Sequence, residues 1–322
     1  MRDARSTTMN PSVVGTYHIY CRTVRRAFLF GLDKYLGKDF SHRRAWVKER
    51  VEFLAAYFAI DVFFFAFLSN HTHIILRNLP SKVEGWSDEE VIRRACHVFP
   101  YKFKRLGVKN SEPTEKRLKE LVRNSELIGE MRSRLADPSW FKRQLNQYIA
   151  TRANKEDDCK GHFFQGRFEH EPISGLFALL ICAMYVDLNE FAAKMVKSPS
   201  NSKGSSIYHR LKGRAARQQG KDASGFDGFL APIFRQDEPQ SYQPAGQLGS
   251  LRASDDSLFD MALDDYVECL EMLAKQIVEA RLIGKGKPPI SKDGCAVTLF
   301  FELPVRVGKV GRWPVLEDQQ TQ

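Results

Sequence analysis

Two histidines separated by a single residue are the first candidates for chemistry in this chain. His71 and His73 lie in the run Asn70-His-Thr-His-Ile-Ile-Leu76, which has the apolar and β-branched character of a strand. Because side chains alternate along a strand, both imidazoles lie on one face, while Thr72 points the other way. Two neutral ring nitrogens can share one divalent ion. A pair of surface histidines, or one hydrogen-bonded core histidine, explains the same pattern, and the motif alone favours those structural alternatives.

A second candidate is the pair Tyr185 and Asn189 in the apolar segment Tyr185-Val-Asp-Leu-Asn189. Their spacing of four residues places them on the same helix face, one turn apart. An amide oxygen beside a phenol could complete a metal site made of two histidines and an asparagine. The alternative is a packed core tyrosine with an asparagine near a helix end, and taken alone this alternative is preferred.

Several basic and aromatic groups are candidates for contact with nucleic acid. In the predicted strand Phe163-Phe-Gln-Gly-Arg-Phe168, aromatic rings alternate with Gln165 and Arg167, which suits base stacking and phosphate contact. A core strand with two outward polar residues is the alternative. Basic clusters that could contact a DNA backbone, or could equally be solvated surfaces, are Arg22, Arg25 and Arg26, then Lys102, Lys104 and Arg105, and the segment Lys142–Arg152.

The charge of the chain points to an anionic partner in its N-terminal two thirds. The 322 residues carry a formal net charge of +10, and residues 221–322 hold 11 Lys and Arg against 16 Asp and Glu, which leaves +15 on the first 220. Nucleic acid is the commonest partner of such a surface. The six cysteines include no CxxC pair, which argues against a zinc ribbon. With no signal-peptide core in residues 1–12 and no apolar run long enough for a bilayer, we expect a cytoplasmic protein with no membrane partner and no small-molecule cofactor.

The order of the predicted elements indicates an α+β fold. Strands at 16–24, 60–68, 71–76 and 161–173 alternate with helices at 42–58, 88–105 and 174–189, which predicts a ferredoxin-like, split βαβ antiparallel sheet with helices on one face. We expect a disordered N-terminus at 1–14, a catalytic domain at 15–210 with a helical insert at about 110–160, a linker at 211–257 and a C-terminal helical extension at 258–322. Within that extension, Leu258–Leu282 is predicted as an amphipathic helix.

Three of these motifs together resemble a known family. The segment 68–76 resembles the histidine motif of the single-tyrosine HUH transposases (the insertion-sequence-200-like superfamily), in particular the REP-associated tyrosine transposases. Phe163–Phe168 is similar to their "WQGRF" strand, and Met184–Asn189 to their nucleophile helix, "YIxLNP". The resemblance covers roughly residues 15–210. Departures are Thr72 inside the histidine motif, Phe164 in place of Trp, and Glu190-Phe191 in place of Pro-Val.

The resemblance implies a role for each matched position. His71 and His73 would hold Mg²⁺ or Mn²⁺ with Asn189 as third protein ligand, and Tyr185 would be the nucleophile. The implied activity is that of a bacterial transposase and endonuclease, which cleaves and rejoins single-stranded or hairpin DNA in DNA recombination. The product of cleavage would be a 5′-phosphotyrosine. The family includes monomers and homodimers, and members bound to DNA associate with the nucleoid.

Two other functions remain open from the sequence. One is a domesticated, non-catalytic DNA-binding protein on the same fold. The other is a metal-dependent nuclease in which the histidines activate water and Tyr185 is structural. A shortage of carboxylates near these motifs argues against a two-metal hydrolytic site.

Overall fold

The centre of the protein is a four-stranded antiparallel sheet in the order β4-β5-β1-β6. The computed structural model describes residues 9–109, 111–233, 245–259 and 261–282. The strands are β1 (Gly15–Arg22), β4 (Ile60–Phe67), β5 (His71–Asn78) and β6 (Glu169–Ile173), and a small hairpin is formed by β2 (Leu32–Asp33) and β3 (Lys38–Asp39). The split order, in which β5 and β6 flank β1, confirms the predicted α+β, ferredoxin-like arrangement.

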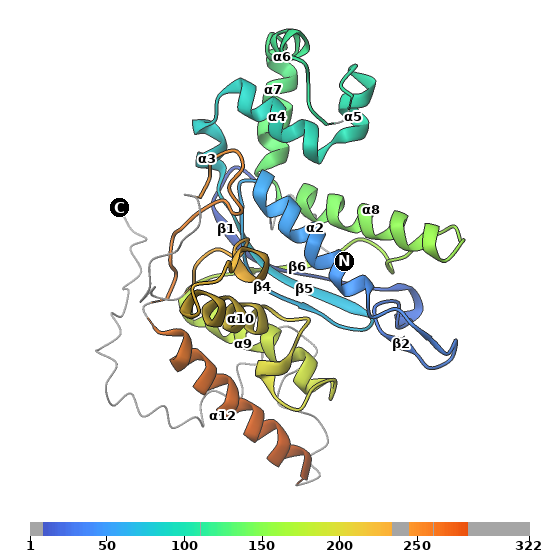
Figure 1. Cartoon of the computed structure of the whole chain (residues 1–322), viewed down its shortest axis with the longest axis vertical. Coiled ribbons are helices and arrows are strands. Elements are labelled where there is room, and N and C mark those ends of the chain that lie inside the picture. The colour runs from blue at the N-terminus through green and yellow to red at the C-terminus, as the bar shows by residue number, and fades with distance from the viewer. Residues whose placement is uncertain (1–8, 110, 234–244, 260, 283–322) are drawn as a thin grey trace.

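The crossover helices of this arrangement pack side by side on one face of the sheet. They are α2 (Arg43–Tyr57), which joins β1 to β4, and α8 (Pro138–Glu156), which precedes β6 (Figure 1). Tyr17, Ile19 and Cys21 of β1 point into the core beneath them. The sequence places α8 in the predicted insert at 110–160, but this helix lies on the sheet, where Lys142 donates from Nζ to Thr72 Oγ1 at 3.2 Å.

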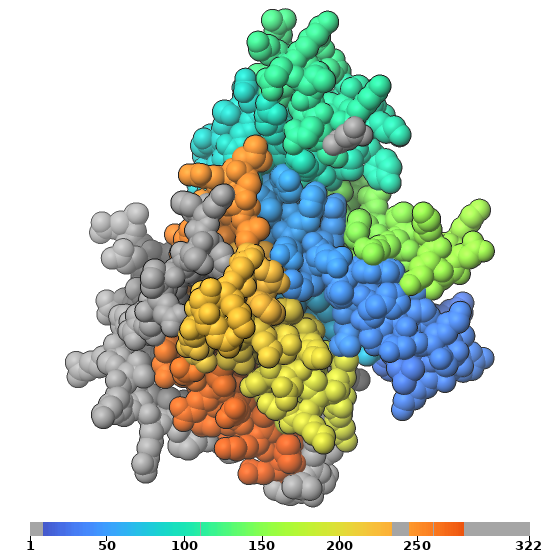
Figure 2. All heavy atoms as spheres, in the orientation of Figure 1, coloured from blue at the N-terminus to red at the C-terminus, as the bar shows by residue number. Residues whose placement is uncertain are grey.

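The remaining helices between β5 and α8 form a lobe that projects from the sheet, as Figure 2 shows. Pro100 separates the predicted helix at 88–105 into two, because proline cannot supply the interior hydrogen bond. The segment 245–259 lies against this lobe, since Arg94 Nη2 donates to Gly246 O at 3.0 Å and Lys82 Nζ to Ala253 O at 2.7 Å. The helices of the lobe are α3 (Pro80–Gly85), α4 (Asp88–Val98), α5 (Pro100–Arg105), α6 (Glu115–Val122) and α7 (Ser125–Leu135).

A third layer covers the opposite face of the sheet. It consists of α9 (Leu176–Ala192), α10 (Ser206–Gln218) and α12 (Leu263–Leu282), with η2 (Pro199–Asn201) and α11 (Ser224–Asp227) in the connections (Figure 1). The prediction of helices on one face thus holds for the crossover helices, and the C-terminal helices add a second covered face. This double coverage explains why all eight residues of β4 are buried.

Two details of the predicted secondary structure are wrong. Residues 163–168 form no continuous strand; they make one isolated bridge, between Phe164 and Thr23, and β6 begins only at Glu169. Phe163 and Phe164 turn inward against Phe30, with ring centroids at 5.3 and 6.3 Å, so packing determines this segment rather than pairing. The helix predicted at 174–189 begins only after Gly175, whose φ of +85° suits glycine, and it extends from Leu176 to Ala192.

The free edge of β4 is covered by later parts of the chain. Phe67 N donates to Gly204 O at 2.8 Å, Ala66 bridges to Ser205, and Ala231 N donates to Val62 O at 2.9 Å. The sequence predicts that the catalytic domain ends at residue 210, but the helix α10 continues across this position to Gln218. Residues 229–231 are also buried in the fold. Residues 1–8 and 283–322 of the predicted N-terminus and C-terminal extension lie outside the described residues.

A buried carboxylate holds the third layer together. Asp187 of α9 accepts hydrogen bonds from Ser206 Oγ at 2.6 Å and Ile207 N at 3.0 Å, at the start of α10, and from Tyr266 Oη of α12 at 3.0 Å. Burial raises the pKa of Asp187 from 3.8 to about 6, and these hydrogen bonds oppose the shift.

We expect Asp187→Asn to remove a pH-dependent part of the stability. The folded-state pKa lies above the unfolded value, so this carboxyl stabilises the fold most below pH 3.8, and the contribution is lost as the pH rises through about 6. The difference in unfolding free energy between the natural protein and the variant should therefore change by up to about 3 kcal/mol between pH 4 and pH 7. Urea unfolding at several pH values measures it, with Glu279→Gln on the exposed side of α12 as control. A difference that does not vary with pH would contradict this account.

Candidate active site

The register between β1 and β5 brings the predicted histidines under α9. Arg22 pairs with His71 and Tyr20 with His73, so these four side chains share one face of the sheet. The ring centroids of His71 and His73 lie 5.0 Å apart, and α9 places Tyr185 5.6 Å from the His73 ring. The structure thus brings Tyr185 to two histidines that precede it by more than a hundred residues in the sequence, and the chemical roles of all three side chains stay predictions.

Thr72 lies on the opposite face, as the alternation predicts. Its hydroxyl contacts Cys21 Sγ at 3.2 Å and accepts a hydrogen bond from the buried ammonium of Lys142. A threonine inside the histidine motif therefore contacts α8 and leaves the histidine side of the strand unchanged.

Asn70 fixes the tautomer of His71. The Asn70 amide donates from Nδ2 to Arg26 O at 3.2 Å, which turns its oxygen toward His71. His71 Nδ1 donates to that oxygen at 2.7 Å. The hydrogen of the neutral ring is therefore on Nδ1, and Nε2 keeps a lone pair.

His73 has a free nitrogen in a buried position. Its Nδ1 lies 2.9 Å from Nε2 of His18 on β1, and its Nε2 has no hydrogen-bond partner among the described residues. Burial lowers the pKa of His73 well below 6.5, and burial likewise lowers the pKa of His71 and His18 to about 4. All three rings are therefore neutral at pH 7, which is the form that binds metal ions.

These features fit a divalent cation at His71 and His73. A buried imidazole nitrogen without a partner is a costly feature of a fold unless a ligand satisfies it. Asn189 lies one turn beyond Tyr185 and would add an amide oxygen. Among the described residues, no three His, Cys, Asp or Glu side chains form a metal-binding group, so a site here depends on the asparagine as third protein ligand.

Tyr185 is held by the helix and by Asn189. The Asn189 amide donates from Nδ2 to Tyr185 O at 2.9 Å, and its side chain also hydrogen-bonds the phenol. Burial raises the pKa of Tyr185, whereas the Asn189 hydrogen bond and the charge of Arg22 lower it. Asn189 and Arg22 thus favour the phenolate that a nucleophilic tyrosine must form.

A second tyrosine lies on the same face, and its surroundings oppose ionisation. Tyr20 has its ring 5.8 Å from His73, and its Oη donates to Glu171 Oε1 at 3.2 Å. Burial and the negative charges of Glu171 and Glu169 raise the pKa of Tyr20 strongly. Electrostatics therefore favours Tyr185 over Tyr20 as the nucleophile.

Four side chains on this face were not predicted from the sequence: His18 and Tyr20 of β1, and Glu169 and Glu171 of β6. Glu169 pairs with Tyr20 and Glu171 with His18, which places both carboxylates on the histidine face, although the described residues form no group of three His, Cys, Asp or Glu side chains that could hold a metal. The alternation His18-Ile-Tyr20-Cys-Arg22 contained the signal for the β1 residues. The register of β6 could not be read from the sequence.

The predicted DNA contacts separate into two groups. Arg22, Arg25, Arg26, Gln165 and Arg167 are all exposed near the end of β1, where Gln165 N donates to Arg22 O at 2.8 Å. This group lies beside His71, whose neighbour Asn70 contacts the Arg26 carbonyl. It provides four positive charges at the edge of the candidate site.

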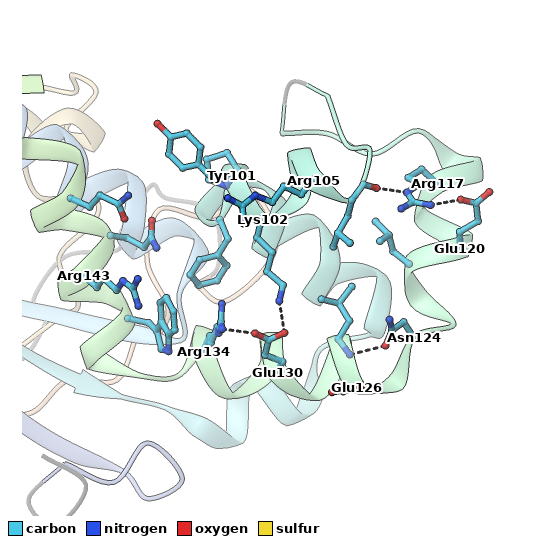
Figure 3. Close-up of a pocket in the computed structure, with 18 residues that line it drawn as sticks. Tyr101, Lys102, Arg105, Arg117, Glu120, Asn124, Glu126, Glu130, Arg134 and Arg143 are labelled. Carbon is cyan, nitrogen blue, oxygen red and sulfur yellow. Dashed lines mark hydrogen bonds and ion pairs between the residues drawn. The ribbon is translucent and has the colours of Figure 1, made fainter. Parts of the chain in front are cut away.

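Lys102, Lys104 and Arg105 lie elsewhere, on α5 in the projecting lobe. Figure 3 shows Lys102 and Arg105 beside a groove of about 980 Å³ between α5, α6, α7 and α8. Lys102 is paired with Glu130, which also contacts Arg134, and the guanidinium of Arg143 lies 4.6 Å from the Trp140 ring centre. The structure does not bring this cluster to the histidines, and its contact with DNA stays a prediction.

Comparison with known proteins leaves the family unassigned. No protein-family model matches the chain, and no curated protein matches it. Among solved structures, the chain is similar to a REP-associated tyrosine transposase bound to a REP hairpin, with a TM-score of 0.35 and 13% identity, covering 66% of this chain and 86% of that chain. None of the described helices has the length and apolar composition needed to cross a membrane.

The turn after β1, beside the candidate site, has an unusual backbone. Arg25 and Arg26 have φ of +51° and +57°, a left-handed conformation that side chains other than glycine rarely adopt. The turn is held by Thr23 Oγ1, which donates to Ala27 O at 2.6 Å, and by the Asn70 amide. Strain of this kind is often retained at functional sites.

We expect Arg26→Gly to stabilise the fold while weakening DNA binding. Glycine adopts a positive φ freely, so the free energy of unfolding should rise by about 1 kcal/mol. Loss of the guanidinium should weaken binding of single-stranded DNA in a salt-dependent manner. Lys119→Gly, at an exposed position inside α6, is the control and should lose about 1 kcal/mol. Equal destabilisation of both variants would argue against strain at Arg26.

Proposed function

We propose that this protein cleaves and rejoins single-stranded or hairpin DNA through a covalent bond to Tyr185, in the manner of a single-tyrosine HUH transposase. The observation that carries the proposal is the convergence of a phenol with two neutral imidazoles. Tyr185 lies 5.6 Å from His73 between ring centroids, and the Nε2 atoms of His71 and His73 are left for a ligand. His71, His73 and Asn189 would hold Mg²⁺ or Mn²⁺, which supplies charge neutralisation at a phosphate oxygen.

The chain's own residues account for the steps of cleavage. The Tyr185 oxygen bonds to phosphorus as the bond from phosphorus to the 3′ oxygen breaks, which leaves a 5′-phosphotyrosine and, after proton transfer, a free 3′-hydroxyl. A phenol with an ordinary pKa near 10 is only ~0.1% ionised at pH 7, a deficit of roughly 4 kcal/mol. Burial raises the pKa of Tyr185 and so enlarges that deficit, while the hydrogen bond from Asn189 and the positive charge of Arg22 partly offset the effect of burial. Because the covalent bond conserves the phosphodiester energy, rejoining requires no ATP.

The binding surface supports a flexible DNA strand as substrate. The exposed arginines and Gln165 surround the end of β1, where a phosphate backbone could approach His71. The candidate nucleophile is itself half-buried against the sheet. A strand that can bend into the site suits this geometry better than a rigid duplex.

A metal-dependent nuclease is the second candidate, because Glu169 and Glu171 lie on the histidine face. In that case one of these carboxylates would activate water and Tyr185 would be structural. The described residues include no group of three His, Cys, Asp or Glu side chains that could hold a metal, which is unfavourable for a two-metal hydrolytic site.

We expect Tyr185→Phe to abolish covalent attachment to DNA while binding is retained. The variant lacks the nucleophilic oxygen and keeps the ring that packs against His18 and His73. The measurement is a denaturing gel of the full chain with end-labelled hairpin DNA and Mn²⁺, beside a binding assay. Tyr20→Phe, a second phenol on the same face, is the matched control and should keep the adduct.

The same experiment distinguishes the alternatives. Labelled fragments with free 5′-phosphate ends and no attached protein would favour the nuclease. Hairpin binding without adduct or cleavage would favour a DNA-binding protein without catalysis. An adduct that forms with Tyr185→Phe and is lost with Tyr20→Phe would identify Tyr20 of β1 as the nucleophile.

We expect Arg22→Gln to slow adduct formation by about 10- to 100-fold. Removing the guanidinium takes away a positive charge that lowers the pKa of Tyr185, so the pKa of the phenol rises. The rate should recover as the pH is raised, because more phenolate then forms, and the pH–rate profile of the variant should shift to higher pH. Arg22→Lys retains the charge and should stay within a few-fold of the natural protein. An unchanged pH–rate profile for Arg22→Gln would contradict this role.

A further inference from the structure

His18 is a buried residue that the proposed chemistry does not use directly. It lies on β1, where it pairs with Ile75, so it is the diagonal neighbour of His73 on the same face. The two imidazoles stack with ring centroids 5.1 Å apart and an interplanar angle of 17°. Their facing atoms, His18 Nε2 and His73 Nδ1, lie 2.9 Å apart.

The position of one proton in this contact decides what His73 can bind. Two neutral imidazoles form one hydrogen bond with a single hydrogen between them. If His73 Nδ1 donates it, His73 Nε2 has a lone pair and can coordinate a cation. If His18 Nε2 donates it, His73 Nε2 carries the other hydrogen and cannot coordinate.

We infer that His18 is a positioning residue, which accepts a hydrogen bond from His73 Nδ1 and so holds His73 in the tautomer whose Nε2 is free for a divalent ion. The inference rests on the proposed function, because it assigns His73 as a metal ligand. In metal sites, a histidine ligand almost always donates a hydrogen bond from the ring nitrogen that does not bind the metal, and the acceptor fixes the tautomer and the orientation of the ring.

The contact made by His71 supports the same arrangement. There the acceptor is the Asn70 amide oxygen, whose orientation is fixed by the bond from Asn70 Nδ2 to Arg26 O. Both histidines of β5 would thus donate from Nδ1 and keep Nε2 for the ligand. His18 has the same relation to His73 that Asn70 has to His71, although it comes from a different strand.

The burial of the pair points to a role in the site. His18 Nδ1 and His73 Nε2 are both buried without a hydrogen-bond partner among the described residues. Two unsatisfied polar atoms in one contact destabilise a fold, and two apolar residues could fill the same space without that cost. A ligand at His73 Nε2 satisfies one of these atoms.

The test measures Mn²⁺ binding to the full chain by calorimetry, without DNA, in two variants of His18. His18→Phe keeps a ring in the stack but removes the acceptor, and we expect 10- to 100-fold weaker Mn²⁺ binding. His18→Gln places an amide oxygen where it can accept from His73 Nδ1, and we expect an affinity within about five-fold of the natural protein. Circular dichroism melting of each variant reports whether the fold is retained.

A second measurement examines the natural protein directly. Two-bond ¹H–¹⁵N correlation spectra of the imidazoles report which nitrogen of each ring is protonated, and we expect His73 in the Nδ1–H form when Mg²⁺, a diamagnetic ion, is bound. An Nε2–H form under these conditions would overturn the inference. Equal Mn²⁺ affinity in His18→Phe and the natural protein would also overturn it and leave the proposed function intact. No Mn²⁺ binding by the natural protein would overturn the proposed metal site together with this inference.

Discussion

The pairing register between β1 and β5 is the constraint on which the candidate site depends. A shift of one residue would turn His71 and His73 toward α2 and α8, into the apolar core beneath the sheet. The register is fixed by that core, because Tyr17, Ile19 and Cys21 of β1 must stay buried on the other face. The apolar alternation on one face therefore determines the polar alternation on the other. The hydrogen bond between His18 and His73 is a direct consequence of it.

The helix that carries the candidate nucleophile is anchored by two buried carboxylates. Asp187 joins it to α10 and α12, and Glu190 joins it to α2 through Arg44, at 2.7 Å, and to Gly204 N at 3.0 Å. These anchors lie two and five residues beyond Tyr185 in the same helix. Such contacts restrict rotation and sliding of the helix. This restriction keeps the Tyr185 phenol in one position relative to the histidines. Glu190, a departure from the motif that the sequence resembles, has thus a structural role of its own here.

The sequence predicts the fold and the central residues of the site better than it predicts their surroundings. The periodicity of strands and helices predicts the ferredoxin-like order. The spacing of His71 with His73 places both on one strand face, and the spacing of Tyr185 with Asn189 places both on one helix face. The contribution of His18 and Glu171 depends on strand register, which local patterns do not encode. The strand expected at 163–168 is an irregular segment because its phenylalanines pack against Phe30. The third layer depends on contacts between distant segments, such as Tyr266 with Asp187, that no local pattern encodes.

The segments that pair with the outer edge of β4 are synthesised late, which affects the nascent chain. The residues that pair with this edge, 204–205 and 231, follow all four strands in the sequence. A nascent or truncated chain that ends before them would hold a complete sheet with an unpaired edge rich in phenylalanine, in the run Ile60–Phe67. Open apolar edges recruit strands from other molecules, which leads to aggregation. Protection of this edge against association therefore depends on residues 204–231, although the candidate chemistry lies in the first 190 residues.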